Sequence, residues 1–267
     1  MDSGFYAASA GLRAQSQALE VSAHNLANLN TAGFRSEQTT FQSLVAASGA
    51  GFSGGPGVAL NGALNTALNR VTSNALNAAT NNFGVLQGTH LDMTAGNLQP
   101  TGNPLDVGIE GSGFFAVQTA RGTRYTRNGS FQVSSSGVLV TATGDPVLSG
   151  SGTGAVINVP AGAVSIASDG TLSVNGAVTG TIQLAEFAAG TKLTPEGGSM
   201  LAAPAGSAKP AKQSTVRQGT LESSNVNSIN SVVTLIGVQR QAEMLQRAMS
   251  LFDTEFNRIA ASDLAKV

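Results

Sequence analysis

The stretch HNLANLNTAGFR, residues 24–35, ends a long apolar pattern and holds three asparagines, one threonine and one glycine. Gly33 can adopt the left-handed backbone conformation that closes a helix, and Phe34 can fold back as the apolar contact of that stop. This explanation leaves the amides of Asn25 and Asn28, beside the apolar pattern, without a role. Amide side chains donate and accept hydrogen bonds, so on a buried seam they fix register without charge. The stretch therefore predicts a helix end at which register matters.

The residues before this stretch have the spacing of a helical seam. Apolar side chains recur in steps of three and four, with polar Gln15 and Ser22 completing the series; they are Phe5, Ala8, Leu12, Leu19, Leu26 and Leu29. Such a narrow stripe predicts a helix of roughly 25 residues that packs in the manner of a coiled coil. Within it we assign Leu12, Leu19 and Leu26 to an assembly seam.

The C-terminal end of the chain repeats this pattern more strongly, from about Ser228 onward. The steps of three and four run without a break through Leu235, Val238, Ala242, Leu245, Met249, Phe252, Phe256 and Ile259. A repeat of 3.5 residues held over this length predicts a left-handed seam against another helix. About 35 residues in one helix would give a rod of about 50 Å. All of these residues except Ala242 and Ile259 are assigned to the assembly seam.

Between the two helical patterns the apolar period falls to about two, which is typical of strands. The strands expected between Leu91 and Gly190 are Leu105–Ile109, Phe114–Gln118, Arg124–Thr126, Ser130–Val133, Val138–Thr141, Val156–Val159, Val164–Ala167, Thr171–Val174 and Thr181–Phe187. They are separated by RNG at 127–129, SSG at 135–137, TGDP at 143–146, SDG at 168–170 and VNG at 174–176. Asn-Gly and Asp-Gly favour tight hairpins, and no room remains for helical crossovers, so the strands should be antiparallel.

The expected fold is therefore α+β, with terminal helices that pair as a coiled-coil-like stem and flank a central antiparallel β domain. The expected divisions are a helix over 1–35, a connecting arm over 36–90, the β domain over 91–194, a linker over 195–217 and the C-terminal heptad helix over 218–267. The arm is rich in Gly and Asn and low in charge. Its composition predicts a flexible or partner-ordered segment, in which Val58–Ala79 could form a short helix.

Composition excludes several kinds of function. The formal net charge is −1, which gives no electrostatic reason to expect binding to nucleic acid or to an anionic membrane surface. The chain has no Cys, so disulfides, thiolate metal sites and thiol nucleophiles are excluded. Charged residues make up 11% of the chain, and a polar but uncharged surface suits packing against other protein. Neither a cleavable secretory signal nor an apolar run long enough to insert directly in a membrane is expected.

Candidate chemical sites have weak support in the sequence. His24 and His90 have no second ligand at metal-binding spacing. The glycines of GIEGSGFF, residues 108–115, are wrongly spaced for a dinucleotide loop and lead into a strand. The isolated acids and the NGS at 128–130 are explained better by turns. We therefore expect no catalytic residue, no cofactor-binding residue and no metal ligand.

The segment NLANLNTAGF, residues 25–34, resembles the N-terminal signature of the bacterial flagellar rod and hook proteins, Asn-x-Ala-Asn-x-x-Thr-x-Gly-Phe. Residues 101–117 and 124–148 resemble the central β block of that family, and residues 218–253 resemble its C-terminal block. The chain departs from the family pattern at Ala32, where many members have proline. The residues that carry the signature are Asn25, Ala27, Asn28, Thr31, Gly33 and Phe34. We assign to three asparagines the role of setting the register of packing; they are Asn25, Asn28 and Asn225.

The resemblance implies a structural subunit of the flagellar rod, the hollow drive shaft that crosses the periplasm and transmits torque. It implies assembly with copies of the same chain and with other rod subunits, contact with the flagellar type III export apparatus and, in the assembled rod, proximity to basal-body ring proteins. Export would occur without a cleaved signal. The opening residues 1–12 and the run at 240–249 are most similar to the proximal-rod type, with the distal-rod type next.

Three other classes of function remain as alternatives. A hook subunit, or a hook-associated factor, would have the same signature but usually a longer chain with an added outer domain. An unrelated secreted β adhesin or phage-tail-like subunit would share the Gly- and Asn-rich strands without needing paired heptad ends. An enzyme that uses the β domain as a scaffold has no supporting set of residues.

Overall fold

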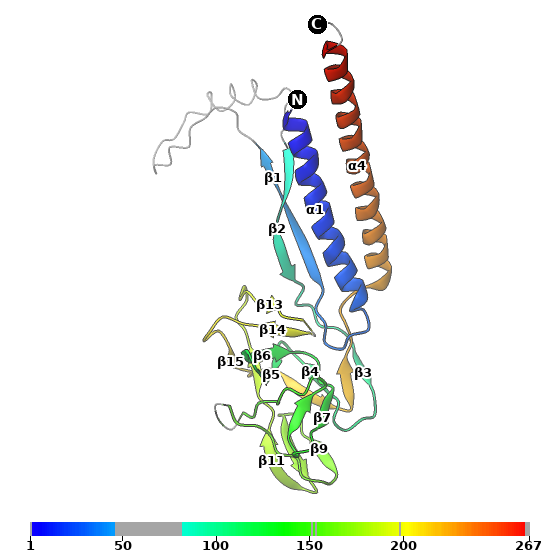
Figure 1. Cartoon of the computed structure of the whole chain (residues 1–267). Coiled ribbons are helices and arrows are strands. Elements are labelled where there is room, and N and C mark those ends of the chain that lie inside the picture. The colour runs from blue at the N-terminus through cyan, green and yellow to red at the C-terminus, as the bar shows by residue number, and fades with distance from the viewer. Residues whose placement is uncertain (1, 46–81, 151, 153, 198, 265–267) are drawn as a thin grey trace, which may run out of the picture. The chain divides into compact units, whose positions relative to one another are not determined.

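The computed structural model describes residues 2–45, 82–150, 152, 154–197 and 199–264. The chain forms two compact units, shown in Figure 1. The helical unit comprises Met1–His24, Glu37–His90 and Ile229–Val267, and the β unit comprises Asn25–Ser36 and Leu91–Ser228. The segment Val58–Ala79, in which a short helix was considered, lies outside the described residues.

Two long helices, α1 (Asp2–Ala27) and α4 (Ser228–Leu264), form most of the helical unit. They lie side by side, as the two heptad patterns predicted (Figure 1). A Cβ atom placed on Gly11 of α1 would lie 3.4 Å from Cδ1 of Leu245 on α4, which is ordinary van der Waals contact. The helices therefore approach closely where α1 has no side chain.

Small residues, rather than leucines, are the most buried positions described on α1. Ala14 and Ala18 are buried, whereas the predicted seam residues Leu12, Leu19 and Leu26 are half-buried. On α4 the half-buried positions include the predicted residues Leu235, Val238, Leu245 and Met249. Phe252 and Phe256 lie in α4, but their side chains are outside the described part. Whether these seam residues make contacts between subunits stays a prediction.

The connecting arm contains strands that the sequence did not predict. Strands β1 (Glu37–Val45) and β2 (Asn82–Leu91) pair in a two-stranded sheet, and Thr40 Oγ1 donates a hydrogen bond of 3.2 Å to the Gly88 carbonyl. Each strand is rich in residues that favour extended backbone, such as Thr, Phe and Val. The pairing joins segments that are distant in sequence, so local composition could not indicate it.

The β unit consists of short strands joined in antiparallel pairs. A six-stranded sheet has the order β13-β14-β6-β5-β12-β15, a three-stranded sheet has the order β11-β10-β9, and the remaining pairs are β16-β4, β17-β3 and β7-β8. The strands are β3 (Leu98–Pro100), β4 (Val107–Glu110), β5 (Phe114–Thr119), β6 (Gly122–Thr126), β7 (Phe131–Val133), β8 (Leu139–Thr141), β9 (Val164–Ile166), β10 (Thr171–Val174), β11 (Ala177–Thr181), β12 (Leu184–Glu186), β13 (Thr194–Pro195), β14 (Met200–Ala202), β15 (Lys209–Pro210), β16 (Thr215–Gln218) and β17 (Thr220–Glu222).

Most of the predicted strands are present. Strands β3, β11 and β17 were not predicted, and β17 lies in the stretch expected as part of the C-terminal helix, which begins at Ser228. The segment Val156–Val159 forms only isolated bridges, through Val156 and Asn158. The expected linker over 195–217 contains strands, because β14 pairs with β6 and β16 pairs with β4. The C-terminal part of the chain thus completes sheets begun about 100 residues earlier, which short-range turn signals cannot reveal.

Two Asn-Gly sequences lie in the described part of the chain, and they have different roles. At 174–176 the hairpin prediction is confirmed, because Asn175 and Gly176 have φ angles of 52° and 86° and Val174 pairs with Ala177. At 127–129 the hairpin prediction is wrong, because β6 and β7 lie in different sheets. There a Cβ on Gly129 would lie 1.7 Å from the Val107 carbonyl oxygen, so the glycine permits close chain contact instead.

The core of the β unit is a cluster of buried aliphatic side chains around two phenylalanines. Phe115 and Phe131 are almost fully buried, and their rings meet edge to face with centroids 5.0 Å apart. The other large fully buried apolar side chains are Leu139, Ile157, Leu172, Val107, Val117 and Val147. This core joins β4, β5, β7, β8 and β10 through side chains rather than through one continuous sheet.

Truncation of Phe131 to alanine should destabilise the β unit by about 3–5 kcal/mol, because a buried ring and its edge-to-face partner are lost. Val178, which is 69% exposed, provides the control, and Val178→Ala should change stability by less than about 0.5 kcal/mol. The measurement is urea unfolding followed by Tyr125 fluorescence in a Tyr6→Phe background. Equal midpoints for the two variants would contradict this assignment of the core.

Candidate functional site

The residues of the family-like signature form a run of tight turns after the end of α1. Asn28 N–H donates to the Asn25 carbonyl at 3.2 Å, Thr31 N–H to the Asn28 carbonyl at 3.2 Å, and Phe34 N–H to the Thr31 carbonyl at 3.3 Å. Each bond spans three residues, as in successive β-turns or a 3₁₀ helix. The spacing of Asn25, Asn28, Thr31 and Phe34 in the signature therefore matches the spacing of these turns.

Side chains of the signature add local support to the turns. Thr31 Oγ1 donates a hydrogen bond of 3.1 Å to Asn28 Oδ1. Ala27 is the last residue of α1 and is exposed, whereas Asn25 and Asn28 are half-buried. The structure brings Asn25, Asn28 and Thr31 together within the chain, and their predicted role in setting register between subunits remains a prediction.

Gly33 has two reasons to be glycine. Its φ angle is +67°, in the left-handed region that the sequence predicted, although α1 already ends at Ala27. A Cβ at this position would lie 2.3 Å from the Arg127 carbonyl carbon and 2.3 Å from the Asn128 nitrogen. Gly33 N–H also donates to the Glu222 carbonyl at 2.8 Å, so the segment is pressed against two distant parts of the β unit.

Asn225 joins three segments through one amide group. Its Oδ1 accepts from Ser36 N–H at 2.7 Å, and its Nδ2 donates to the carbonyls of Asp92 at 2.9 Å and Thr94 at 3.0 Å. The sequence assigned Asn225 to register between subunits. In the structure the amide bonds backbone groups of its own chain, which sets the relative position of residues 36, 92–94 and 225. A role of Asn225 in register between subunits stays a prediction.

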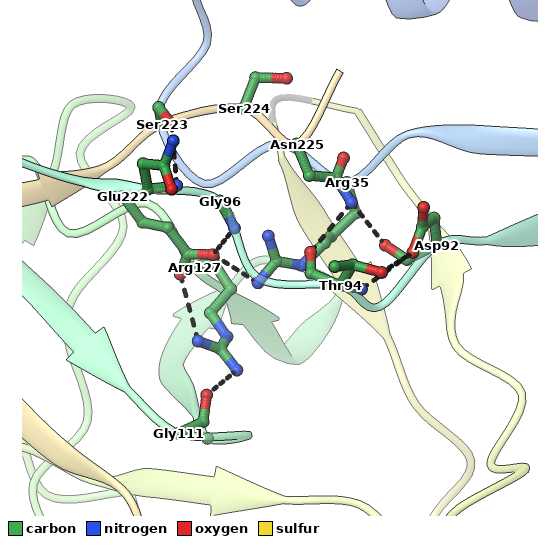
Figure 2. A network of polar contacts seen from close by, with 12 residues as sticks. Arg35, Asp92, Thr94, Gly96, Gly111, Arg127, Glu222, Ser223, Ser224 and Asn225 are labelled. Atoms are coloured by element: carbon green, nitrogen blue, oxygen red, sulfur yellow. Dashed lines mark hydrogen bonds and ion pairs between the residues drawn. The ribbon is translucent and has the colours of Figure 1, made fainter. Parts of the chain in front are cut away.

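A buried ion cluster, defined here as Arg35, Arg127 and Glu222, lies next to Gly33 and is shown in Figure 2. Glu222 Oε1 is 2.6 Å from Arg35 Nη2, and Glu222 Oε2 is 3.1 Å from Arg127 Nη1. Gly96 N–H donates to Oε1 at 2.8 Å. All three side chains are at most 3% exposed. One carboxylate thus holds together the residue that follows the signature, a residue of the central domain and its own strand β17.

The two arginines of the cluster are incompletely paired. Burial lowers the pKa of Arg127, the Glu222 carboxylate raises it, and the positive charge of Arg35 lowers it. Arg127 Nη2 donates to the Gly111 carbonyl at 2.7 Å, and the guanidinium lies 4.7 Å from the centre of the Phe114 ring. Among the described residues, Arg127 Nε and the side-chain nitrogens of Arg35 have no hydrogen-bond partner. The Arg35–Glu222 contact is therefore an ion pair without an aligned N–H.

The histidines do not form a metal site in the described part of the chain. His24 Nδ1 lies 3.3 Å from Glu37 Oε1 in the helical unit, and no group of three or more potential metal ligands is found among the described residues. No described helix is both long enough and apolar enough to cross a membrane. The buried ion cluster holds the segments of the β unit together by packing and by attraction between opposite charges.

Sequence reasoning missed Arg35, Arg127 and Glu222 as site residues. Arg35 was noted only as the last residue of the opening stretch, and Arg127 was assigned to a hairpin turn. The available signal was that charged residues are scarce, that Arg127 and Glu222 stand inside segments of family resemblance, and that Arg35 directly follows one. Their sequence separations of 92 and 95 residues hid the cluster until the fold placed them together.

Gly33→Ala should destabilise the β unit by about 2–5 kcal/mol, since the left-handed φ and the steric conflict with the 127–128 peptide add together. Gly190 is a matched control, because its φ is +84° but nothing lies within 4 Å of its Cβ position. Gly190→Ala should cost only about 1–2 kcal/mol. Hydrogen exchange of residues 91–228 measures the loss of stability in each variant. The close-contact explanation fails if the two variants lose equal stability.

Glu222→Gln should destabilise the β unit by about 3–5 kcal/mol, because two buried cations lose their shared anion. Glu110→Gln is the control, since Glu110 is 52% exposed and its contact with Arg217, at 3.2 Å, is a surface ion pair worth at most about 1 kcal/mol. Thermal unfolding of both variants checks the difference. A Glu222→Gln protein as stable as the control would show that the cluster does not stabilise the fold.

Comparison with known proteins gives three family matches in chain order. Residues 5–35 match the family described as flagella basal body rod protein, residues 108–174 match the flagellar hook protein FlgE/F/G D1 domain, and residues 217–260 match the flagellar basal body rod FlgEFG protein C-terminal region. The first and last matched segments contain Arg35 and Glu222, and the central one contains Arg127. The buried ion cluster therefore takes one residue from each matched segment.

Curated relatives match along most of the chain. The flagellar basal-body rod protein FlgF of Mesorhizobium japonicum is 30% identical over 91% of this chain and 90% of that protein. FlgF of Caulobacter vibrioides is 28% identical over 100% of both chains, and FlgG of Bacillus subtilis is 30% identical over 88% of this chain and 89% of that protein. The chain belongs to the flagellar basal-body rod protein family and is a structural subunit of that rod.

Proposed function

We propose that this rod subunit is of the proximal, FlgF-like type. The observation that carries this assignment is the FlgF match that extends over the whole of both chains. A third FlgF relative, from Escherichia coli, is 36% identical over 62% of this chain and 71% of that protein. The distal, FlgG-like type is the second candidate, because the Bacillus subtilis FlgG is as similar as the Mesorhizobium japonicum FlgF.

The proposed mechanism is torque transmission through packed helices. In each subunit α1 and α4 pair, and these pairs pack with those of neighbouring subunits into an inner tube. The support is a second apolar face on α4, away from the half-buried seam, whose exposed members are Ile229, Val232, Val233, Ile236, Met244 and Leu251. Apolar residues on both faces suit a helix that has more than one helical neighbour. The β unit would form an outer layer that stiffens the shaft.

Assembly with other rod subunits follows from family membership, and the particular partners are proposals. We propose copies of the same chain and adjacent rod proteins as lateral and axial neighbours, joined by head-to-tail contacts that do not close into a ring. Passage through the flagellar type III export apparatus and contact with surrounding ring proteins are proposed on the same family basis. The register residues Asn25 and Asn28 would act at these subunit contacts.

Leu245→Glu should abolish incorporation into the rod, because the charge would face Gly11 at the half-buried seam between the paired helices without a partner. Gln246→Glu, on an exposed neighbouring position, should leave incorporation unchanged. The measurements are swimming in soft agar and immunodetection of the subunit in isolated basal bodies, with hydrogen exchange showing that residues 91–228 remain folded. Normal swimming by the Leu245→Glu strain would contradict the seam assignment.

The proximal assignment has a separate test. The chain is expressed in two strains of its source bacterium, one lacking its FlgF-type subunit and one lacking its FlgG-type subunit. If the chain is the proximal subunit, it should restore swimming only in the strain that lacks its FlgF-type subunit. Rescue of the second strain alone would replace the proximal assignment by the distal one, while the rod function would stand.

A further inference from the structure

The β unit contains a surface cavity of about 180 Å³ that no part of the proposed mechanism uses. Its inner wall is formed by Phe114, Phe187 and Leu193, and its rim by the small residues Ala188, Ala189 and Gly190. The rim is held in a turn, because Thr191 donates to the Ala188 carbonyl through N–H at 3.0 Å and through Oγ1 at 2.8 Å. The cavity is therefore bounded by a closed turn.

Aromatic side chains pack against one another along the inner wall. The Phe187 ring meets the Phe114 ring edge to face at 5.6 Å and the Tyr125 ring at 4.9 Å. Phe114 and Leu193 are buried. An engineered apolar cavity of about 150 Å³ accommodates benzene, so this cavity has room for one aromatic or large aliphatic group.

Arg127 lines the same cavity and gives it a positive end. Its side chain is 3% exposed, and its Nε–H is without a hydrogen-bond partner in the described structure. Behind it, the buried ion cluster carries two positive charges and one negative charge. A buried cluster with a net positive charge is stabilised by a nearby anionic group.

We infer that this cavity binds an apolar side chain accompanied by a carboxylate from a neighbouring rod subunit. The apolar group would lie against Phe114 and Phe187, and the carboxylate would lie at the Arg127 end of the cavity and offset the net positive charge of the cluster. This inference rests on the proposed assembly function, which supplies the neighbour. Buried aromatic walls and a desolvated arginine are typical of the residues that dominate binding energy at protein interfaces.

Charge complementarity selects this partner over other apolar groups. A purely apolar group would cover the wall but leave the net positive charge of the cluster without a counter-ion, which costs free energy. A basic group would add a third positive charge to the cluster. An acidic–apolar pair covers the wall and neutralises that charge, so the carboxylate should contribute measurably to binding.

The first test uses 3-phenylpropionate as a probe and its uncharged amide, 3-phenylpropanamide, as the comparison. Each is titrated into the isotopically labelled full chain, and backbone NMR shifts of Gly190 and Thr191 are followed. We expect the carboxylate to bind with a millimolar Kd and the amide at least tenfold more weakly. Equal binding of the two probes, or no shift with either, would overturn the inference.

A cavity-filling variant provides the matched control. Ala189→Trp should remove the shifts caused by 3-phenylpropionate, because the indole occupies the exposed rim. Ala177→Trp places the same side chain at an exposed position on the β10–β11 hairpin and should leave the Kd within twofold. Unchanged binding by Ala189→Trp would place the probe elsewhere and contradict the assignment of the cavity.

The partner is tested in the assembled rod. Ala189→Trp should reduce incorporation into basal bodies at least tenfold, whereas Ala177→Trp should not. Normal incorporation of Ala189→Trp would overturn the assignment of a neighbouring rod subunit as the occupant. The probe titration needs no rod, so failure of the proposed assembly function would appear with Leu245→Glu while probe binding persisted.

Discussion

The fold of the β unit depends on one buried carboxylate shared by two arginines. Glu222 contacts Arg35 at 2.6 Å and Arg127 at 3.1 Å, and its own backbone carbonyl accepts from Gly33. Burial of these charges is unfavourable unless the geometry is maintained, so any separation of the three segments leaves a charge without its partner. Residues near the two ends of the chain are thereby required to meet on the central domain before the unit is complete.

This constraint explains why the signature segment is part of the β unit rather than only the end of a helix. Its three successive turns carry the chain from Asn25 to Phe34, where Gly33 passes within van der Waals limits of the 127–128 peptide. Asn225 then fixes Ser36 to residues 92–94. The amides that first suggested register between subunits have at least one clear intramolecular use. Register inside the subunit and register between subunits can thus depend on the same polar chemistry.

The helices and the β unit differ in how much of their apolar surface is buried within one chain. The β unit buries its apolar core within one chain, through Phe115, Phe131 and their aliphatic neighbours. Helix α4 instead retains an exposed apolar face after pairing with α1. A subunit that assembles with others of its kind needs the first part to fold independently and the second to remain available for neighbours. The cavity beside Arg127 suggests that the β unit also contributes a specific contact.

The class of fold could be predicted from the sequence, because heptad spacing, strand alternation and Asn-Gly turns are local signals. These signals predicted both terminal helices, the antiparallel β domain, the hairpin at 174–176 and the left-handed Gly33. The pairing of β1 with β2, the strands within 195–217 and the non-hairpin role of residues 127–129 depend on contacts that become visible in the folded chain. The same holds for the Arg35–Glu222–Arg127 cluster. These features join residues far apart in the chain. The local sequence around a buried charge does not indicate which distant residue carries the opposite charge.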